Sequence, residues 1–125
     1  MRTVARGWAA VLAAASIVGC GDPGGLALGN AENAVVTVGP GSSPLYTWTE
    51  GDARRLVVTD LVSGEVIWDI QALDAGLGFF SPVDHGVVPQ GAQELVAARL
   101  LRAGSRHLVV VTLVGGGEAR AEFIP

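Results

Sequence analysis

Residues 107–124, which read HLVVVTLVGGGEARAEFI, decide the fold class of this chain. Residues 108–114 form an almost unbroken apolar run. A strand of that composition is expected in the middle of a sheet, because at an exposed edge it would recruit other chains. Three glycines follow at 115–117 and supply the positive-φ residues that a tight turn uses. The stretch therefore predicts a β-hairpin whose second strand is 118–124.

Upstream of this hairpin, short apolar or alternating segments are separated by Gly, Pro and Ser clusters roughly every 8 to 12 residues. Trp48 is expected in the core, and Val66, Trp68 and Ile70 are expected on one face of their strand. No window predicts a helix, and residues 71–78 predict a loop. The expected strands before the hairpin are 34–38, 45–49, 54–61, 65–70, 79–83 and 94–98. We therefore expect an all-β fold, a single antiparallel β-sandwich of about seven strands over residues 34–125.

Three segments resemble fibronectin type III-like and related immunoglobulin-like domains. Residues 101–111 (LRAGSRHLVVV) are similar to the approach to strand F in those families, residues 46–48 (YTW) to strand B, and residues 56–58 (LVV) to strand C. His107 stands where the families have a tyrosine whose hydroxyl bonds back to the preceding backbone. Either an imidazole nitrogen substitutes for that hydroxyl or the corner is absent. The resemblance implies the sandwich architecture and no activity, because this fold hosts many unrelated functions.

The first 19 residues have the layout of a secretory signal, with Arg2 and Arg6 ahead of an apolar stretch at 7–18. Twelve helical residues cover about 18 Å, which is too short to span a hydrocarbon core of about 30 Å. The segment ends Ile-Val-Gly-Cys at 17–20 and resembles the lipobox of bacterial lipoprotein precursors. That resemblance implies cleavage before Cys20 and a diacylglycerol on its thiol. The alternative is cleavage after a small residue such as Ala15, which would leave Cys20 as a free thiol.

Residues 20–33 are rich in Gly, Pro and Asn and predict a lipid anchor followed by a flexible tether of about 20 Å. In the lipoprotein family the residues after the cysteine influence sorting, and an aspartate directly after it marks inner-membrane retention. Here Gly21 precedes Asp22, so the resemblance favours the outer membrane if the organism has two membranes. The expected location is the cell envelope, with the membrane as a partner through the lipid.

Charge sets further limits on function. The net charge is -4, which is too acidic for an electrostatic grip on nucleic acid. After cleavage before Cys20, the chain keeps all 12 acids but only six of its eight arginines, giving a side-chain charge of -6. That sign repels anionic headgroups, so the lipid must hold the protein on the membrane.

The sequence supports neither catalysis nor a cofactor. Asp84 and His85 are adjacent, and neighbouring strand residues point to opposite faces, so solvation in a loop is the expected role of His85. No serine lies in a Gly-x-Ser-x-Gly elbow. The two histidines are 22 residues apart and no calcium-loop pattern occurs, so we expect no metal site. His107 is expected in the core, bonded to a backbone carbonyl.

The aromatic residues Trp68, Phe79 and Phe80 are the candidates for contact with a ligand or partner. Exposed rings stack on sugars or anchor proteins, but consecutive strand residues face opposite ways, so only one of the two phenylalanines is expected in the core. We expect a lipid-anchored, non-catalytic binding or structural module. The alternatives are recognition of a carbohydrate or envelope polymer through these rings, and an accessory subunit that binds an envelope protein along the edge of strand 34–38.

Overall fold

The computed structural model describes residues 33–125. The predicted signal, Cys20 and all but the last residue of the predicted tether lie outside the described residues. The described part of the chain folds into eight strands: β1 (Val36–Val38), β2 (Leu45–Trp48), β3 (Ala53–Asp60), β4 (Val66–Ala72), β5 (Val83–Asp84), β6 (Ala92–Val96), β7 (His107–Leu113) and β8 (Glu118–Phe123). Within residues 33–125, no helix is long and apolar enough to cross a membrane.

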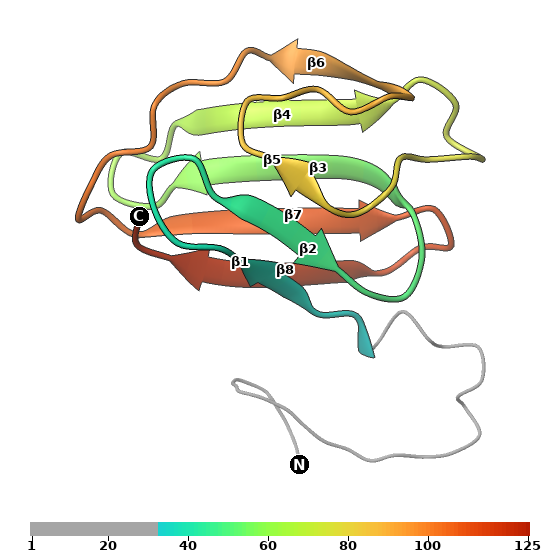
Figure 1. Ribbon diagram of the computed structural model, residues 1–125, viewed down its shortest axis with the longest axis horizontal. Coiled ribbons are helices and arrows are strands. Elements are labelled where there is room, and N and C mark those ends of the chain that lie inside the picture. The colour runs from blue at the N-terminus through green and yellow to red at the C-terminus, as the bar shows by residue number, and fades with distance from the viewer. Residues whose placement is uncertain (1–32) are drawn as a thin grey trace. The chain divides into compact units, whose positions relative to one another are not determined.

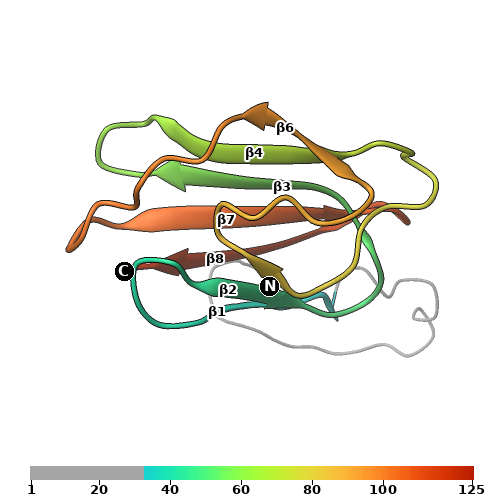
Figure 2. The same ribbon diagram turned by 45° about the horizontal axis from the view of Figure 1, so that its top comes forward.

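The strands form two antiparallel sheets that lie one over the other (Figures 1 and 2). The small sheet has the order β1-β2-β5 and the large sheet the order β6-β4-β3-β7-β8. The predicted all-β sandwich is therefore confirmed, with eight strands where about seven were expected. The expected edge position of the first strand is also confirmed, since β1 has a neighbour in the sheet on one side only.

The apolar strand β7 lies inside the large sheet, between β3 and β8, as its composition predicts. Val110 pairs with Val57 on one side and with Arg120 on the other. The turn into β8 places Gly116 and Gly117 at φ of 91° and 102°, and the Leu113 amide donates to the Gly117 carbonyl. Positive φ at two successive positions explains why glycines occupy this turn.

The core fills the space between the inner faces of the two sheets. Every second residue of β7, from His107 to Leu113, is buried, as expected for a strand with one face on a core. Tyr46 and Trp48 of the small sheet and Trp68 of the large sheet are the bulkiest of the aromatic core residues. The prediction of Trp48 as a core residue is confirmed.

The structure corrects the predicted face of β4. Val58 pairs with Trp68 but Thr59 pairs with Val66, so one residue of β4 is skipped in a bulge. A bulge reverses the in-and-out alternation beyond it. Ile67 is therefore buried while Val66 is partly exposed, and Val66 does not share the buried face of Trp68 and Ile70.

The segment predicted as strand 79–83 is only partly paired. Phe79 forms an isolated bridge with Ala53, and regular pairing with β2 is confined to β5. Pro82 has no backbone N–H to donate to β2. The Trp48 amide of β2 donates to the side-chain hydroxyl of Ser81, at 2.9 Å. The next strand, β6, lies two residues earlier than the predicted 94–98.

Candidate functional site

The three predicted contact residues have different environments. Trp68 is fully buried and Phe79 is 1% exposed, whereas Phe80 is 72% exposed. The expectation that one phenylalanine is in the core and the other is not is confirmed. Burial leaves neither the Trp68 ring nor the Phe79 ring accessible to a ligand in this structure. Cys20 lies outside the described residues.

Trp68 is buried because contacts from distant parts of the chain enclose it. Its indole Nε1 donates to Glu94 Oε2 of β6 at 2.8 Å. Its ring centroid lies 6.5 Å from that of Tyr46 and 5.2 Å from that of His85. Burial of the ring with its N–H paired is the usual arrangement of a core tryptophan.

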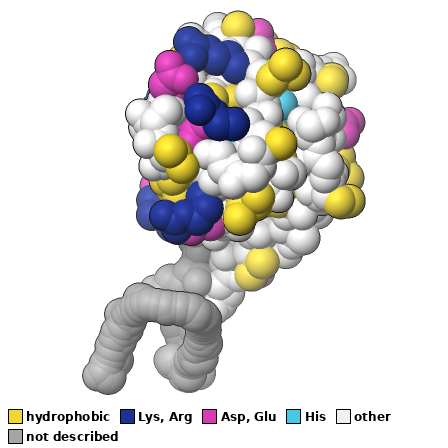
Figure 3. Space-filling model, turned by 90° about the vertical axis from the view of Figure 1, so that its left-hand side faces the viewer, with side chains coloured by type: hydrophobic (Ala, Val, Ile, Leu, Met, Phe, Trp, Pro, Cys, Tyr) yellow, Lys and Arg dark blue, Asp and Glu magenta, His cyan; other side chains and the backbone are white. Residues whose placement is uncertain are grey.

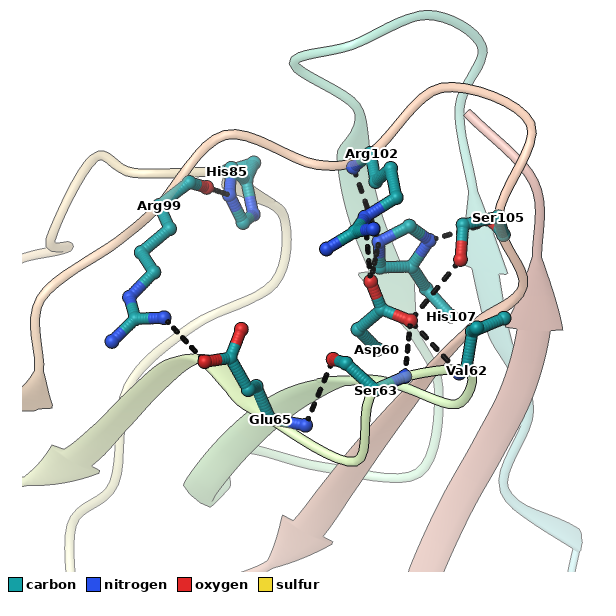
Figure 4. Close-up of polar contacts among 9 residues, drawn as sticks. All are labelled: Asp60, Val62, Ser63, Glu65, His85, Arg99, Arg102, Ser105 and His107. Carbon is teal, nitrogen blue, oxygen red and sulfur yellow. Dashed lines mark hydrogen bonds and ion pairs between the residues drawn. The ribbon is translucent and has the colours of Figure 1, made fainter.

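At one end of the sandwich, Asp60, Ser105 and His107 meet under the loop that joins β6 to β7 (Figure 4). Asp60 Oδ1 accepts hydrogen bonds from the amides of Val62 and Ser63, at 2.8 and 3.3 Å, and from the Ser105 hydroxyl at 3.1 Å. All three cluster residues are buried. These are the residue types of a catalytic triad, in which a histidine nitrogen accepts the proton of the serine hydroxyl.

The geometry excludes a catalytic triad, because the His107 imidazole is hydrogen-bonded to main-chain groups and not to the Ser105 hydroxyl. His107 Nδ1 lies 2.8 Å from the Ser105 carbonyl oxygen, which can only accept, so Nδ1 donates. Nε2 accepts from the Arg102 amide at 3.3 Å. No nitrogen is left to take a proton from the Ser105 hydroxyl, which donates to Asp60. The expected core position and carbonyl bond of His107 are confirmed, and both ring nitrogens are used.

The Asp60 carboxylate is held in its charged form. Burial raises the pKa of Asp60, but the hydrogen bonds from the amides of Val62 and Ser63 and from the Ser105 hydroxyl outweigh it, so that this pKa lies below its ordinary value. Arg102 Nε lies 3.5 Å from Oδ2 and adds a partly exposed positive charge. The carboxylate therefore ties the β3–β4 turn to the loop between β6 and β7.

His85 occupies a second, separate histidine site. The expectation that this residue is simply solvated in a loop is wrong: its ring is half-buried and both nitrogens are bonded. Nε2 donates to the Arg99 carbonyl at 2.9 Å, and Nδ1 accepts from the Tyr46 hydroxyl at 2.9 Å. Asp84 makes no contact with this ring among the hydrogen bonds and ion pairs of the described chain.

Burial also sets the acid–base behaviour of this site. Desolvation lowers the pKa of His85, and the hydrogen bond to the Arg99 carbonyl offsets part of this effect. Desolvation raises the pKa of the Tyr46 hydroxyl. Both groups are therefore held neutral near pH 7, which suits a fixed structural bond.

The surface over this end of the sandwich is charged but internally paired. Figure 3 shows Arg side chains beside Asp and Glu side chains on this end. Arg99 pairs with Glu65 at 3.2 Å and Arg106 with Glu122 at 3.0 Å, and all four of these side chains are more than half exposed. Opposite charges at such distances leave little net field for a charged ligand.

A different surface, the outer face of the small sheet, carries the outward-facing residues of β1 and β2, and the exposed Phe80 lies three residues before β5 of this sheet. The inward residues of these strands, Val36, Tyr46 and Trp48, are buried, so the intervening residues point outward. The alternation of residues 45–49 predicts that Thr47 faces away from the core, but it does not show which strands lie beside it.

No group of three or more His, Cys, Asp or Glu side chains within residues 33–125 is placed to hold a metal ion. Comparison with known proteins finds no family model, no curated protein and no solved structure that matches the chain.

Proposed function

We propose that the protein is a bacterial lipoprotein, anchored at the cell envelope through Cys20, whose β-sandwich acts as a non-catalytic binding or structural module. One observation carries the proposal. The sequence Ile17-Val18-Gly19-Cys20 follows a signal-like segment and matches the lipobox at every position. The alternative site after Ala15 would leave an exported free thiol.

The start of the fold supports this arrangement. β1 begins at Val36, so 15 residues separate it from Cys20. Two or three acyl chains anchor a protein durably, whereas one myristoyl chain is marginal. Such an anchor would keep the sandwich close to the bilayer in spite of its net negative charge.

We also propose that the sandwich is fibronectin type III-like or immunoglobulin-like. The strand compared with B, β2, lies in the small sheet, while those compared with C and F, β3 and β7, are neighbours in the large sheet. Immunoglobulin sandwiches separate B from C and F in the same way. His107 bonds to the carbonyl two residues upstream, which supports its comparison with the family's corner tyrosine.

A non-catalytic role is supported by the use of the chemically capable side chains. Asp60 and His107 are buried and bonded to backbone groups, and His85 joins Tyr46 to the Arg99 carbonyl. Groups committed to such bonds are unavailable as acids, bases or nucleophiles.

The experiment is an intact-mass measurement of the protein purified from bacterial membranes, with labelled palmitate in the growth medium. We expect a mass that lacks residues 1–19 and includes a diacylglycerol, and label that disappears in Cys20→Ser. Ser16→Ala, which leaves the lipobox unaltered, is the matched control. Cys20→Ser protein that is processed and retained on membranes like the control would refute the proposal.

Outer-membrane location is part of the proposal where the host has two membranes. The residue after Cys20 is Gly21, and the family's retention signal at that place is aspartate. We expect membrane fractionation to find the protein in the outer membrane and Gly21→Asp protein in the inner membrane. Equal distribution of the two variants would contradict this.

A second candidate is an accessory subunit that binds an envelope protein by strand addition, and the position of β1 favours it. β1 is an edge strand, and the bonds of Val35 and Gly39 to β2 leave the main-chain groups of Val36 and Val38 turned toward the free edge. Crosslinking in whole cells should then trap one partner, and Val38→Pro should reduce that product. Unchanged crosslinking would count against strand addition.

Of the three aromatic residues considered for recognition of a carbohydrate or envelope polymer, one has an exposed ring. Phe80 is exposed, but Trp68, its expected companion, is not. Retention of the purified protein on an insoluble neutral glucan, and its loss in Phe80→Ala, would favour this function.

A further inference from the structure

The outer face of the small sheet carries no charge over most of its area. Thr37 and Thr47 are directly opposite each other, and both are exposed. Tyr46 pairs with Val83, so the register places Thr47 beside Pro82. Val35 (57% exposed) and Leu45 (40%) add apolar side chains. Phe80 is exposed next to Ser81, whose hydroxyl accepts from the Trp48 amide of β2. Asp84, which pairs with Leu45 at the end of the sheet, is the first charged residue that this face presents.

The outer face of the large sheet is different. Arg55 and Asp69 form an ion pair there with Nη2–Oδ2 at 2.7 Å. Edge strand β8 presents Glu118, Arg120 and Glu122, all exposed. The end of the sandwich under the β6–β7 loop is also lined with arginines and acids (Figure 3). Of these three surfaces, only the outer face of the small sheet includes β1, the first strand after Cys20 in the sequence.

The length of chain before β1 limits how far the small sheet can lie from an anchor at Cys20. Asn33, the first described residue, is 13 positions after Cys20. The composition of this stretch predicts a flexible chain, for which 13 residues give a typical end-to-end distance of about 20 Å. β1, the first strand after this stretch in the sequence, is the edge strand of the small sheet (Figure 1). An acylated Cys20 would therefore hold this sheet near the bilayer.

We propose that, when Cys20 is acylated, the outer face of the small sheet lies against the lipid headgroups, with Phe80 and Leu45 at the interface. The proposal rests on the proposed lipid anchoring. The mature chain has a side-chain charge of -6, and anionic lipids repel its acidic surfaces. An uncharged face with threonine hydroxyls and a few apolar side chains meets no such repulsion, and aromatic and leucine side chains favour the interface.

Labels on matched threonines test this orientation. The chain has one cysteine, which the lipid occupies, so an introduced cysteine can be labelled selectively. Thr47→Cys places a fluorophore on the outer face of the small sheet, and Thr112→Cys places it on the outer face of the large sheet. Leu100→Cys, at a residue that is 90% exposed, samples the β6–β7 loop. The acylated mature protein, which begins at Cys20, is reconstituted in phosphatidylcholine vesicles that contain lipids with a nitroxide headgroup.

We expect nitroxide quenching at position 47 to exceed that at positions 112 and 100 by about twofold or more. Phe80→Asp should abolish this difference, whereas Arg120→Asp on the large sheet should leave it unchanged. Equal quenching at all three positions, or stronger quenching at 112 or 100, would overturn the proposed orientation.

The remaining outcomes distinguish the proposed orientation of the small sheet from the proposed acylation of Cys20. Shielding of position 47 that depends on protein concentration would identify a second copy as the occupant, and shielding that requires added neutral glucan would identify a polysaccharide. Either result overturns lipid contact. The intact mass of the same sample reports acylation: a chain without lipid overturns both proposals, whereas an acylated chain without the quenching difference overturns only the orientation.

Discussion

The end of the sandwich beneath the β6–β7 loop and the outer face of the small sheet differ in a way that residue type alone does not reveal. The first brings together Asp60, Ser105 and His107, residues associated with catalysis, but all three are buried and bonded to neighbouring groups. The second consists of side chains such as Thr47 and Phe80, which are exposed. Of these two regions, the one with the reactive residue types is bonded within the fold, and the one with unreactive side chains is open to solvent.

The two histidines make the same comparison on a smaller scale. Each donates one ring N–H to a backbone carbonyl, but His85 does so through Nε2 and His107 through Nδ1. His107 is fully buried, and its ring stacks on Phe123 with centroids 5.4 Å apart. His85 is only half-buried. Substitutions at the two sites should therefore differ in their effect on stability.

The largest loss of stability is expected at His107. His107→Ala should lower the free energy of unfolding by about 3 kcal/mol, because it creates a cavity and strands the Ser105 carbonyl and the Arg102 amide. His107→Phe fills the space but still strands both groups, so its loss should be about 2 kcal/mol. Urea denaturation followed by tryptophan fluorescence measures both. Losses below about 1 kcal/mol would show that the loop does not depend on this ring.

Asp60→Asn is expected to have the next largest effect, a loss of about 2 kcal/mol at pH 7. The lowered pKa of Asp60 means that its stabilisation is complete above the ordinary carboxyl pKa of about 3.9 and is lost as the pH falls through the lower folded value. The variant should therefore lose less stability than the parent protein on acidification. Parallel pH profiles for the two proteins would contradict this role of the carboxylate.

Local pattern predicted the hairpin of β7 and β8, because an apolar run and a glycine turn lie within one short segment. It did not predict the environment of His85, whose partner Tyr46 is 39 residues away, or that of Trp68, whose partner Glu94 is 26 residues away. Alternation indicates which face a residue lies on, but not what covers that face.

The bulge in β4 escaped prediction for a related reason. Val66, Trp68 and Ile70 alternate regularly in sequence, and only the pairing with β3 shows that Ile67 is skipped. Phe79 and Phe80, by contrast, follow directly from strand geometry, because adjacent residues must face opposite ways. The sequence therefore predicts that one of these two rings is buried, and only the packing of the folded chain shows that the buried ring is Phe79.

Tyr46→Phe tests the bond at the second histidine. The hydroxyl donates to His85 Nδ1, but this ring is half-buried and water can replace the lost donor. We expect a loss of about 1 kcal/mol in the free energy of unfolding, smaller than the loss in His107→Phe. The same denaturation series gives both values, and a reversed order would break the proposed distinction between the two sites.

Acid titration of His85 gives a smaller effect. Since burial lowers the pKa of this imidazole, its contribution to stability is complete above its ordinary pKa of about 6.5 and is lost as the pH falls toward the folded value. Stability should therefore decrease on acidification within this range in the parent protein. His85→Gln should show a flatter profile there, and an equally steep one would assign the decrease to another group.

The smallest effect on folding is expected on the open face. Phe80 contributes a mostly exposed ring, so Phe80→Ser should change the free energy of unfolding by no more than about 0.5 kcal/mol. The same holds for Thr47→Ala. Chemical denaturation beside His107→Ala provides the scale. If Phe80→Ser destabilised the protein as much as His107→Ala, the Phe80 ring would contribute to the stability of the fold, and its exposure would no longer argue for contact with another surface. If Phe80→Ser does not change stability, an effect of this substitution on membrane contact can be attributed to the interface alone.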